Sequence, residues 1–495
     1  MRFRGAVTFL AICLWAGAAM AADRVALVMG IADYQSIGPL KNTINDARRI
    51  SETLEQIGFD VTTAFDTTSQ QMHDLLDEFA FRSETADLAL IYFAGHGVEV
   101  QGENFLIPAD AQVASNADIQ RQAVSLKDML VAVDKARKMR IVILDSCRNN
   151  PFGDLIDTSE TVAGGNPGAA DTRGGGGLAQ PAPDRGTLVS FAAKDGNVAL
   201  DGSGDNSPFA LALSDRLKQP NLEISLMFRQ VRDQVLQSTA NQQEPHTYGS
   251  LSGVPFYLAG TDGTEAAVDD RRIAWSDLRP EQEAQLTRLA DGGDTRSMLG
   301  LGYMRLNPDT ERFDPAAAAD LFTRAADAGA AEAQFELAKL YEQGLGVPQD
   351  PARALALYQS SAAQDFADAI NDLGFFYYQG GLGLPRDPQK ALSLFERAAD
   401  LRHPQAMFNF AALIDDGLIA GKGAEDSASY LYNALRTGSD DVLKIMTEQP
   451  QMFSIDTRKA LQRKLQEVAF YDGAIDGDFG PGTQRSIRRA YGLTD

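Results

Sequence analysis

The cysteine and histidine best placed to do chemistry each follow an apolar segment of this chain. His96 comes after Leu88–Ala94, and Cys147 comes 51 residues later, after a second segment that includes Ile141–Leu144. Both segments have the apolar, β-branched composition of a buried parallel strand, and each residue is predicted to sit in a tight turn at the strand's end. A thiolate is a strong nucleophile, and a neighbouring imidazole can take up its proton and return it to a leaving group. The pair therefore predicts catalysis by a cysteine nucleophile and a histidine base.

The elements that would position His96 and Cys147 alternate between strands and helices. We expect strands near residues 25–31, 59–65, 88–95, 104–108, 140–146, 187–193 and 254–258, and helices near 44–57, 72–79, 126–133, 208–217 and 225–237. This alternation predicts a parallel-dominated sheet covered by helices on both faces. The carboxyl ends of its strands share one edge, where such sheets hold ligands, so both residues are expected there.

The two motifs around these residues are specific ones. Tyr92–Gly97 (YFAGHG) and Leu144–Asn149 (LDSCRN) resemble the histidine and cysteine motifs of caspase-like cysteine peptidases of the C14 type, in particular the bacterial branch near the metacaspases and orthocaspases. The resemblance covers about residues 24–258, roughly half of the chain. It implies an α/β caspase-like fold and an endopeptidase that uses the Cys147/His96 dyad. We expect the backbone N–H groups of Gly97 and Cys147 to form the oxyanion hole, because glycine allows close backbone approach.

The resemblance also bears on specificity. True caspases cut after aspartate and carry a glutamine two positions before the nucleophile, where this chain has Asp145. In the metacaspase pattern a second acid lies at the start of the first helix, and Asp46 matches it. Two carboxylates on a pocket floor would select Arg or Lys as the residue before the scissile bond, because a buried cation needs paired charge. Two points count against this: Lys41 lies nearby, and Asp46 could instead be an acid favoured by the helix dipole.

A segment of about residues 157–185 is rich in Gly, Ala, Pro and Asp and is predicted to be a flexible surface linker. In the caspase-like family such a linker often divides one catalytic domain into two portions. Arg173 and Arg185 each precede a glycine here, and basic sites in flexible sequence suit proteolysis. We expect self-cleavage at these two residues.

The N-terminus indicates export. Arg2 and Arg4 precede an apolar run at residues 6–18 and a small-residue site at 19–21, so residues 1–22 are predicted to be a cleaved signal peptide. An uncleaved membrane anchor is the alternative, although the run is short for a membrane span. The protein is expected to be periplasmic or secreted, without a membrane span after signal cleavage.

Cysteine usage supports the catalytic interpretation. The chain has two cysteines, and Cys13 lies within the expected signal peptide. The mature protein would keep Cys147 alone and could form no internal disulfide. A lone thiol in an exported protein is a liability unless it is used.

Composition and spacing exclude some classes of partner. The net charge of −23 argues against a nucleic-acid partner and favours basic substrates, though it also serves solubility. His73, His246 and His403 lie far apart, and the sequence contains neither Cys-x-x-Cys nor His-x-x-x-His. We therefore expect no metal site and no cofactor. Some metacaspases depend on calcium, which this sequence neither supports nor excludes.

The second half of the chain repeats with a period of 36 to 37 residues, as the spacing of Ser297, Ala333, Ala369 and Ala406 shows. Such a period with two amphipathic segments predicts stacked helical hairpins. The repeats resemble Sel1-type repeats, relatives of the TPR class, in four copies from about 297–327 to about 406–438. The resemblance implies a concave surface that binds protein partners, and the alternative is a spacer.

The last segment, 454–495, holds a turn dense in Gly and Asp between two short helices. Its string at 471–483 (YDGAIDGDFGPGT) resembles a peptidoglycan-binding-like module, and peptidoglycan is the implied ligand. The alternative is a small docking bundle with no affinity for glycan.

The expected order is therefore a signal peptide (1–22), a caspase-like peptidase domain (23–260), a linker or helix (261–290), an all-α Sel1/TPR-like solenoid (291–445) and a small α-helical module (454–495). We interpret the whole as an exported cysteine endopeptidase that cleaves after Arg or Lys. The rival interpretation is a periplasmic scaffold that binds partners through its repeats and carries a vestigial peptidase domain.

Overall fold

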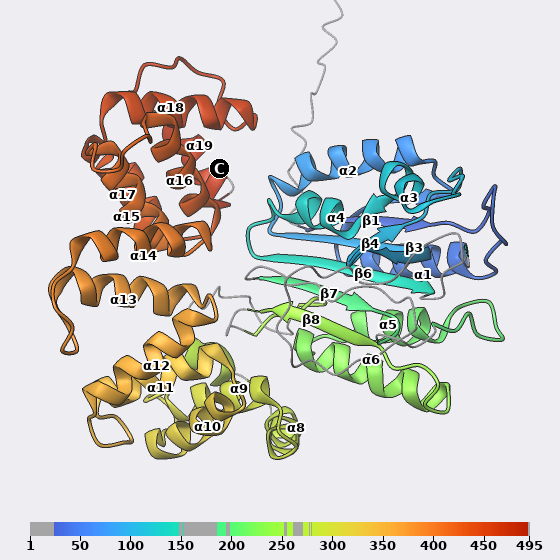
Figure 1. Ribbon diagram of the computed structural model, residues 1–495, viewed down its shortest axis with the longest axis horizontal. Helices are drawn as coiled ribbons and strands as arrows, with labels where there is room; N and C mark the ends of the chain where they lie inside the picture. The colour runs from blue at the N-terminus through green and yellow to red at the C-terminus, as the bar shows by residue number, and fades with distance from the viewer. Residues whose placement is uncertain are drawn as a thin grey trace, which may run out of the picture.

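The computed structural model describes residues 24–147, 152, 186–194, 199–251, 255–260, 271–276, 278 and 280–493 (Figure 1). The expected signal peptide and the expected linker at 157–185, with Arg173 and Arg185, lie outside the described residues. The described chain forms an α/β part, coloured blue to green in Figure 1, and a helical array, coloured yellow to red.

The α/β part is built on a sheet with the strand order β2-β1-β3-β6-β7-β8. The bounds are β1 Arg24–Gly30, β2 Asp60–Phe65, β3 Leu88–Val100, β6 Met139–Cys147, β7 Thr187–Phe191 and β8 His246–Ser250. The neighbouring pairs are parallel except β7 and β8, which are antiparallel. The predicted parallel-dominated sheet is confirmed.

Helices cover both faces of this sheet (Figure 1). On one face lie α1 (Thr43–Gln56), α5 (Pro208–Leu217) and α6 (Ile224–Ser238), and on the other lie α2 (Ser69–Ser83) and α4 (Leu126–Val133). Successive residues of β3 serve the two cores in turn: Leu90 and Tyr92 belong to the first, Ile91 and Phe93 to the second. The central strands are apolar on both sides for this reason.

The prediction of a tight turn at His96 is wrong. β3 runs on to Val100 and pairs there with the antiparallel strand β4 (Glu103–Leu106), which also pairs with β5 (Val124–Ser125). The strand can continue because β4 offers backbone partners beyond the ends of β1 and β6. A short helix, α3 (Asn116–Gln122), lies between β4 and β5 in the chain and is absent from our expectations.

The last strand is also misplaced by the sequence pattern. The structure has it at His246–Ser250, and of the described residues 255–260 only Tyr257 makes a bridge, to Glu223. Pro255 explains part of the difference, since it has no N–H to donate to a ladder.

The helical array begins with α7, and helices that follow one another in the chain pack against each other. Its members are α7 Arg271–Ser276, α8 Pro280–Asp291, α9 Thr295–Arg305, α10 Pro315–Asp327, α11 Ala331–Gln343, α12 Pro351–Ala363, α13 Ala367–Gln379, α14 Pro388–Asp400, α15 Pro404–Asp415, α16 Ala424–Arg436, α17 Asp440–Glu448, η2 Pro450–Met452, α18 Ile455–Glu467 and α19 Pro481–Tyr491. The second helix of each of the first three hairpins has the same start. Asp314, Asp350 or Asp387 caps the helix by accepting a backbone N–H, and a proline follows at the first helical position.

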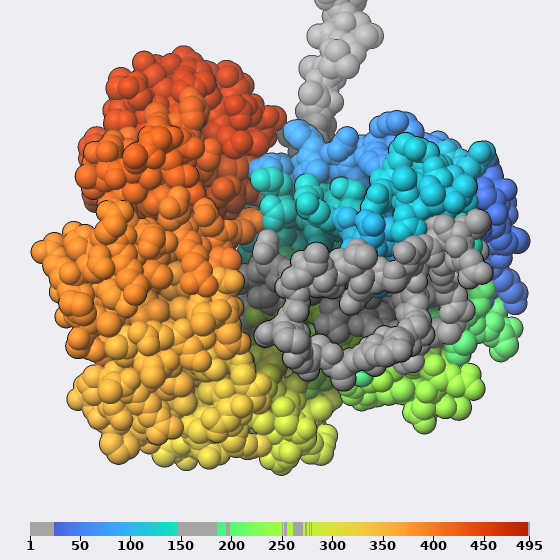
Figure 2. Space-filling view, viewed as in Figure 1, coloured from blue at the N-terminus to red at the C-terminus, as the bar shows by residue number. Residues whose placement is uncertain are grey.

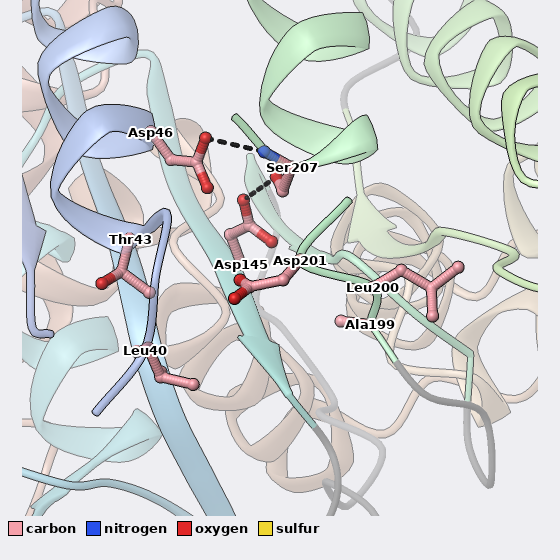
Figure 3. A pocket seen from close by; sticks show the side chains of 9 residues that line it. Leu40, Thr43, Asp46, Asp145, Ala199, Leu200, Asp201 and Ser207 are labelled. Carbon is pink, nitrogen blue, oxygen red and sulfur yellow. Dashed lines mark hydrogen bonds between the residues drawn. The ribbon is translucent and has the colours of Figure 1, made fainter. Parts of the chain in front are cut away.

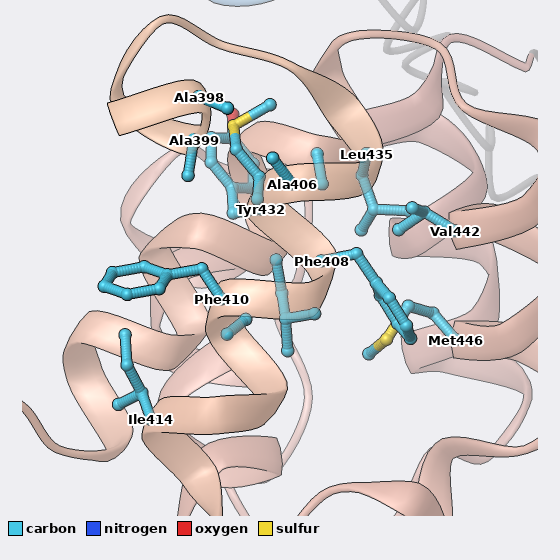
Figure 4. Packing of buried hydrophobic residues seen from close by; sticks show 14 of the residues in the cluster. Ala398, Ala399, Ala406, Phe408, Phe410, Ile414, Tyr432, Leu435, Val442 and Met446 are labelled. Atoms are coloured by element: carbon cyan, nitrogen blue, oxygen red, sulfur yellow. The ribbon is translucent and has the colours of Figure 1, made fainter. Parts of the chain in front are cut away.

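Small residues let the paired helices approach. A side chain at Gly374 would place its Cβ 2.7 Å from the ring of Phe395, so only glycine fits at this crossing. Farther along the array, Phe408, Val442 and Met446 belong to one apolar cluster that joins α15 to α17 (Figure 4). None of the described helices has the length and apolarity needed to cross a membrane.

The array lies beside the α/β part (Figure 2) and contacts it near its start and again from the loop after α14 onward. Near its start, Arg296 forms an ion pair with Glu223 at 2.9 Å. Farther along, Arg402 of the loop between α14 and α15 pairs with Asp134 at 2.8 Å, and Arg436 of α16 donates to the carbonyl of Lys135 at 3.2 Å. Asp134 and Lys135 lie just before β6, so the array's end meets the amino edge of the sheet, opposite the edge that holds His96.

Candidate active site

His96 and Cys147 are direct neighbours in the sheet. β3 and β6 run parallel, and their register places His96 opposite Cys147, the last residue of β6. Adjacent strands lie about 4.8 Å apart. The sheet therefore brings together the two residues that the sequence singles out, at its carboxyl edge. The side chain of Cys147 lies outside the described part, and the roles of the two residues remain predictions.

The segment after β1 surrounds His96. The backbone N–H of His96 donates to the Tyr34 hydroxyl at 2.8 Å, and the two rings lie 4.8 Å apart at 53°. Nε2 of His96 lies 3.4 Å from the carbonyl of Gly38. Because a carbonyl can only accept, this contact favours the tautomer with hydrogen on Nε2 and a lone pair on Nδ1.

The remaining nitrogen of His96 is suited to a base. Nδ1 is buried and has no hydrogen-bond partner among the described residues. Burial lowers the pKa of His96 below its ordinary value, against smaller opposing effects from the Gly38 carbonyl and the Asp201 charge. The imidazole is therefore neutral at neutral pH, the form that can accept a proton.

An acidic pocket lies at this edge of the sheet (Figure 3). Gly95, the residue before His96, forms part of its wall. Three aspartates from different parts of the chain also line it: Asp46 from α1, Asp145 from β6 and Asp201 from the segment before α5. The remaining lining residues are Leu40, Thr43, Ala199, Leu200 and Ser207.

Ser207 joins two of these carboxylates. Its backbone N–H donates to Oδ1 of Asp46, and its hydroxyl donates to Oδ2 of Asp145, both at 2.9 Å (Figure 3). The Tyr92 hydroxyl donates to the same oxygen of Asp145 at 2.8 Å, and Asn206 donates to Asp46 at 2.9 Å. The two carboxylates are thus fixed by neutral donors. Asp46 does lie in the first turn of its helix, so the helix dipole favours it there as well.

Burial dominates the electrostatics of the pair. Asp46 is 2% exposed and Asp145 is 7% exposed. Burial raises the pKa of Asp46 to about 6 and the pKa of Asp145 to about 7, and the negative charge of Asp46 adds to the shift at Asp145. No ion pair to either carboxylate occurs within the described chain. A cation that entered the pocket would supply the missing countercharge.

Asp201 is the acidic residue of the pocket that sequence reasoning missed, and Ser207 was missed as well. Asp201 stands in a turn rich in Gly, Ser and Asp, where nothing local distinguishes it from its neighbours. Its carboxylate accepts the backbone N–H of Lys41 at 3.3 Å. The Lys41 ammonium donates instead to the carbonyl of Gly204 at 3.2 Å, and Lys41 does not line the pocket. Among the described residues, Lys41 thus forms no ion pair with the pocket acids.

The other predicted site residues are placed as follows. Gly97 follows His96 in β3, opposite Leu106 of β4, and its part in an oxyanion hole remains a prediction. No group of three His, Cys, Asp or Glu side chains arranged to hold a metal ion is found in the described ranges. Calcium dependence stays untested.

Comparison with known proteins identifies the two main parts. Residues 23–256 match the family model of the caspase domain. This part of the chain is a caspase domain. Residues 295–329, 331–366 and 367–403 match the Sel1 repeat, so three Sel1 repeats follow the caspase domain. The fourth predicted copy, around 406–438, forms the helices α15 and α16 and lies beyond these matches.

Relatives share only part of their length with this chain. The human mucosa-associated lymphoid tissue lymphoma translocation protein 1 is 30% identical over 139 residues, which is 28% of this chain and 16% of the relative. Its mouse homolog is 30% identical over 142 residues, 28% of this chain and 17% of the homolog. The match thus spans about a sixth of these relatives.

Two solved structures are also similar. The structure of pro-sf-caspase-1 is 16% identical with a TM-score of 0.36, covering 50% of this chain and 94% of that one. A Sel1 repeat protein from Oxalobacter formigenes is 20% identical with a TM-score of 0.30, covering 42% of this chain and 98% of that one.

The glycine- and aspartate-rich string near the C-terminus has a structural use. Gln462 of α18 is fully buried, and its side chain donates to the Asp478 carbonyl at 3.0 Å and to Thr483 Oγ1 at 3.1 Å. It also accepts the backbone N–H of Gly477 at 2.7 Å. These contacts hold the turn between α18 and α19. Glycan binding by this module remains a prediction.

Proposed function

We propose that this protein is a cysteine endopeptidase that cleaves after Arg or Lys. The observation that carries the proposal is the acidic pocket whose wall includes Gly95, directly before His96. An Arg or Lys side chain in this pocket would face Asp46, Asp145 and Asp201, and the described lining residues include no basic side chain. The peptide bond after that residue would then lie beside His96 and Cys147.

The reaction follows from the two residues at the strand ends. Nδ1 of His96 takes the thiol proton of Cys147, and the thiolate attacks the carbonyl carbon. The imidazolium gives its proton to the leaving amine, and a thioester forms between Cys147 and the new carboxyl end. Water, activated by the now neutral imidazole, hydrolyses this thioester and restores the thiol. The N–H groups of Gly97 and Cys147 stabilise the oxyanion in both steps.

The caspase domain suggests protein substrates, and the Sel1 repeats suggest protein partners. Arg173 and Arg185 satisfy the proposed specificity and would be self-processing sites. An exported location, periplasmic or secreted, is part of the same proposal. N-terminal sequencing of protein stored under active conditions tests both cleavages, and an intact chain contradicts self-processing.

The deciding experiment is hydrolysis of fluorogenic peptides that end in Arg, Lys or Asp, by the protein and by its Cys147→Ala variant. We expect cleavage of the Arg and Lys peptides only, and none by the variant. Cleavage after Asp alone contradicts the basic specificity. Undiminished cleavage by Cys147→Ala contradicts the mechanism.

The second candidate function is a scaffold, which the three Sel1 repeats favour. In that case the repeats bind protein partners, and the caspase domain has no catalytic duty. Complementation of a deletion strain separates the two candidates, because Cys147→Ala should restore function only if the protein is a scaffold. Co-sedimentation with purified peptidoglycan tests the C-terminal module, and absence of binding favours a docking bundle.

A further inference from the structure

The strand that carries His96 changes its partner at this residue. On the side of β3 that faces the parallel strand β1, the last backbone hydrogen bond runs from the N–H of Ile31, directly after β1, to the carbonyl of Ala94, at 2.9 Å. On the same side, the antiparallel neighbour β4 is joined through the N–H of Ile107 to the carbonyl of His96, at 3.0 Å. Between these two bonds lies the N–H of His96 itself. Its acceptor is a side chain, the Tyr34 hydroxyl, at 2.8 Å.

Tyr34 contacts His96 and its neighbour in the strand. The Tyr34 ring lies 4.8 Å from the imidazole. A Cβ at position 95 would lie 2.7 Å from the Tyr34 hydroxyl oxygen. The backbone of β3 can therefore approach Tyr34 this closely only because residue 95 is glycine. The phenol therefore touches the backbone before His96, the N–H of His96 and its ring.

The segment that holds Tyr34 is itself firmly anchored. The N–H groups of Ala32 and Asp33 donate to Oδ1 of Asp66, at 2.7 and 3.0 Å. The N–H of Gln35 donates to the carbonyl of Ala109 at 2.9 Å. Tyr34 thus stands between two fixed points, and its hydroxyl position is determined by the fold rather than by His96.

We propose that Tyr34 is a positioning residue for His96, whose hydroxyl closes the gap between the two partner strands and whose ring orients the imidazole. The inference rests on the proposed function, since it assigns a helper to the proposed base. Tyr34 does not itself line the pocket, although it contacts Gly95, which does, and it acts through His96. Loss of its hydroxyl leaves the N–H of His96 without its acceptor, and the strand must shift to find another.

The first measurement is steady-state kinetics of Tyr34→Phe with an arginyl peptide. We expect kcat to fall about tenfold, because small displacements of a catalytic group are costly. KM should stay within about twofold, because the pocket aspartates are untouched. Tyr430→Phe is the matched control: it removes a phenol that donates to Asp400 at 2.7 Å in the helical array, and it should leave kcat unchanged.

The second measurement does not require peptidase activity. The chain has only four histidines, so the imidazole NMR signals of the Cys147→Ala protein can be assigned with His96→Gln. Burial lowers the pKa of His96. In Tyr34→Phe the loosened ring should gain water contact, so its pKa should rise toward its ordinary value, while Tyr430→Phe should not change it.

The outcomes separate the two proposals. An unchanged His96 titration overturns the positioning role, whether or not kcat falls. So does an unchanged kcat in an active enzyme, even if thermal unfolding shows a loss of stability. A shifted titration in a protein that cleaves no peptide supports the role of Tyr34 and contradicts the proposed function instead.

Discussion

Asp46 and Asp145 are carboxyl groups whose pKa values are raised by burial. Both are nearly fully buried, and both receive hydrogen bonds from Ser207 rather than from a basic side chain. Such a pair is costly to ionise in the empty pocket, and burial raises both pKa values. The cost would be recovered when a cationic side chain enters.

The pair should make the stability of the free protein fall as pH rises. A carboxyl whose pKa is raised by folding binds its proton more tightly in the folded state, so its stabilisation is complete below about pH 4 and is lost up to about pH 7. The asparagine of Asp145→Asn cannot ionise, so this variant should show a smaller change of unfolding free energy with pH. Urea unfolding at pH 5 and pH 8 measures it, with Asp215→Asn as an exposed control on α5. An equal change of unfolding free energy between pH 5 and pH 8 for the protein and for Asp145→Asn contradicts a raised pKa of Asp145.

The same ionisation should control recognition of basic substrates. We expect the affinity for a reversible arginyl peptide aldehyde to rise between pH 6 and pH 8, as the pair of carboxyls with pKa values of about 6 and about 7 becomes charged. Any change in affinity caused by titration of His96 lies at lower pH, because burial lowers the pKa of His96. Inhibition constants across this range provide the measurement, and a flat profile argues against the pocket.

Removal of one carboxylate tests the pocket directly. Asp46→Asn should lower kcat/KM for arginyl peptides about 100-fold, since breaking a buried charge pair costs about 3 kcal/mol. The loss should be mainly in KM, in contrast to the effect expected of Tyr34→Phe. A variant with unchanged KM would show that the basic residue binds elsewhere.

At the scale of elements, one arginine joins a short helix to two repeats. Arg271 of α7 contacts Glu336 of α11 at 3.2 Å, Glu332 of the same helix at 3.4 Å and Asp368 of α13 at 3.6 Å. The Tyr303 hydroxyl donates to Glu332 at 2.7 Å in the same cluster. The three acids come from equivalent faces of successive repeats, so the arginine bridges the repeat boundary.

Loss of this arginine should destabilise the array. Arg271→Met removes the cation that Glu332, Glu336 and Asp368 share and leaves Glu336 with Lys339, at 3.1 Å, so it should lower the free energy of unfolding by about 3 kcal/mol. Adding Glu332→Gln to Arg271→Met should recover part of the loss, because the charge of Glu332, which pairs with Arg271, is removed as well. Chemical unfolding of the single and double variants measures the coupling, and additive effects would contradict it.

At the scale of the whole molecule, the array meets the sheet at the edge opposite to His96. Arg436, which is 2% exposed, donates to the carbonyls of Ala490 and Lys135 at 3.1 and 3.2 Å. It thereby links α16, the end of α19 and the segment before β6. The Tyr432 hydroxyl donates to Glu84, just before β3, so β3 and β6, the strands that carry His96 and Cys147, both begin at this interface.

Weakening this interface should loosen the docking without loss of catalysis. In Arg436→Ala we expect faster amide exchange at residues 84–88 and 134–139, because the bond to the Lys135 carbonyl is lost and the neighbouring contacts of Tyr432 and Arg402 lose its support. The kcat for an arginyl peptide should change less than about twofold, since the contacts lie at the amino edge. A large fall in kcat would instead show that the docked array controls the carboxyl edge.

The sequence by itself determined the alternation of strands and helices and the repeats, and it singled out His96 and Cys147, which the sheet brings together. These features depend on local patterns: apolar runs before His96 and Cys147, helical periodicity, and a period of 36 to 37 residues. Asp46 and Asp145 came from the resemblance to a family, and the fold places both in one pocket. Only the tertiary structure decided the rest. Asp201 and Tyr34 approach the site from loops with no local signal, because their contacts join segments far apart in the chain. The edge of the sheet on which the array docks is likewise a property of the chain's path in space, which no local pattern encodes.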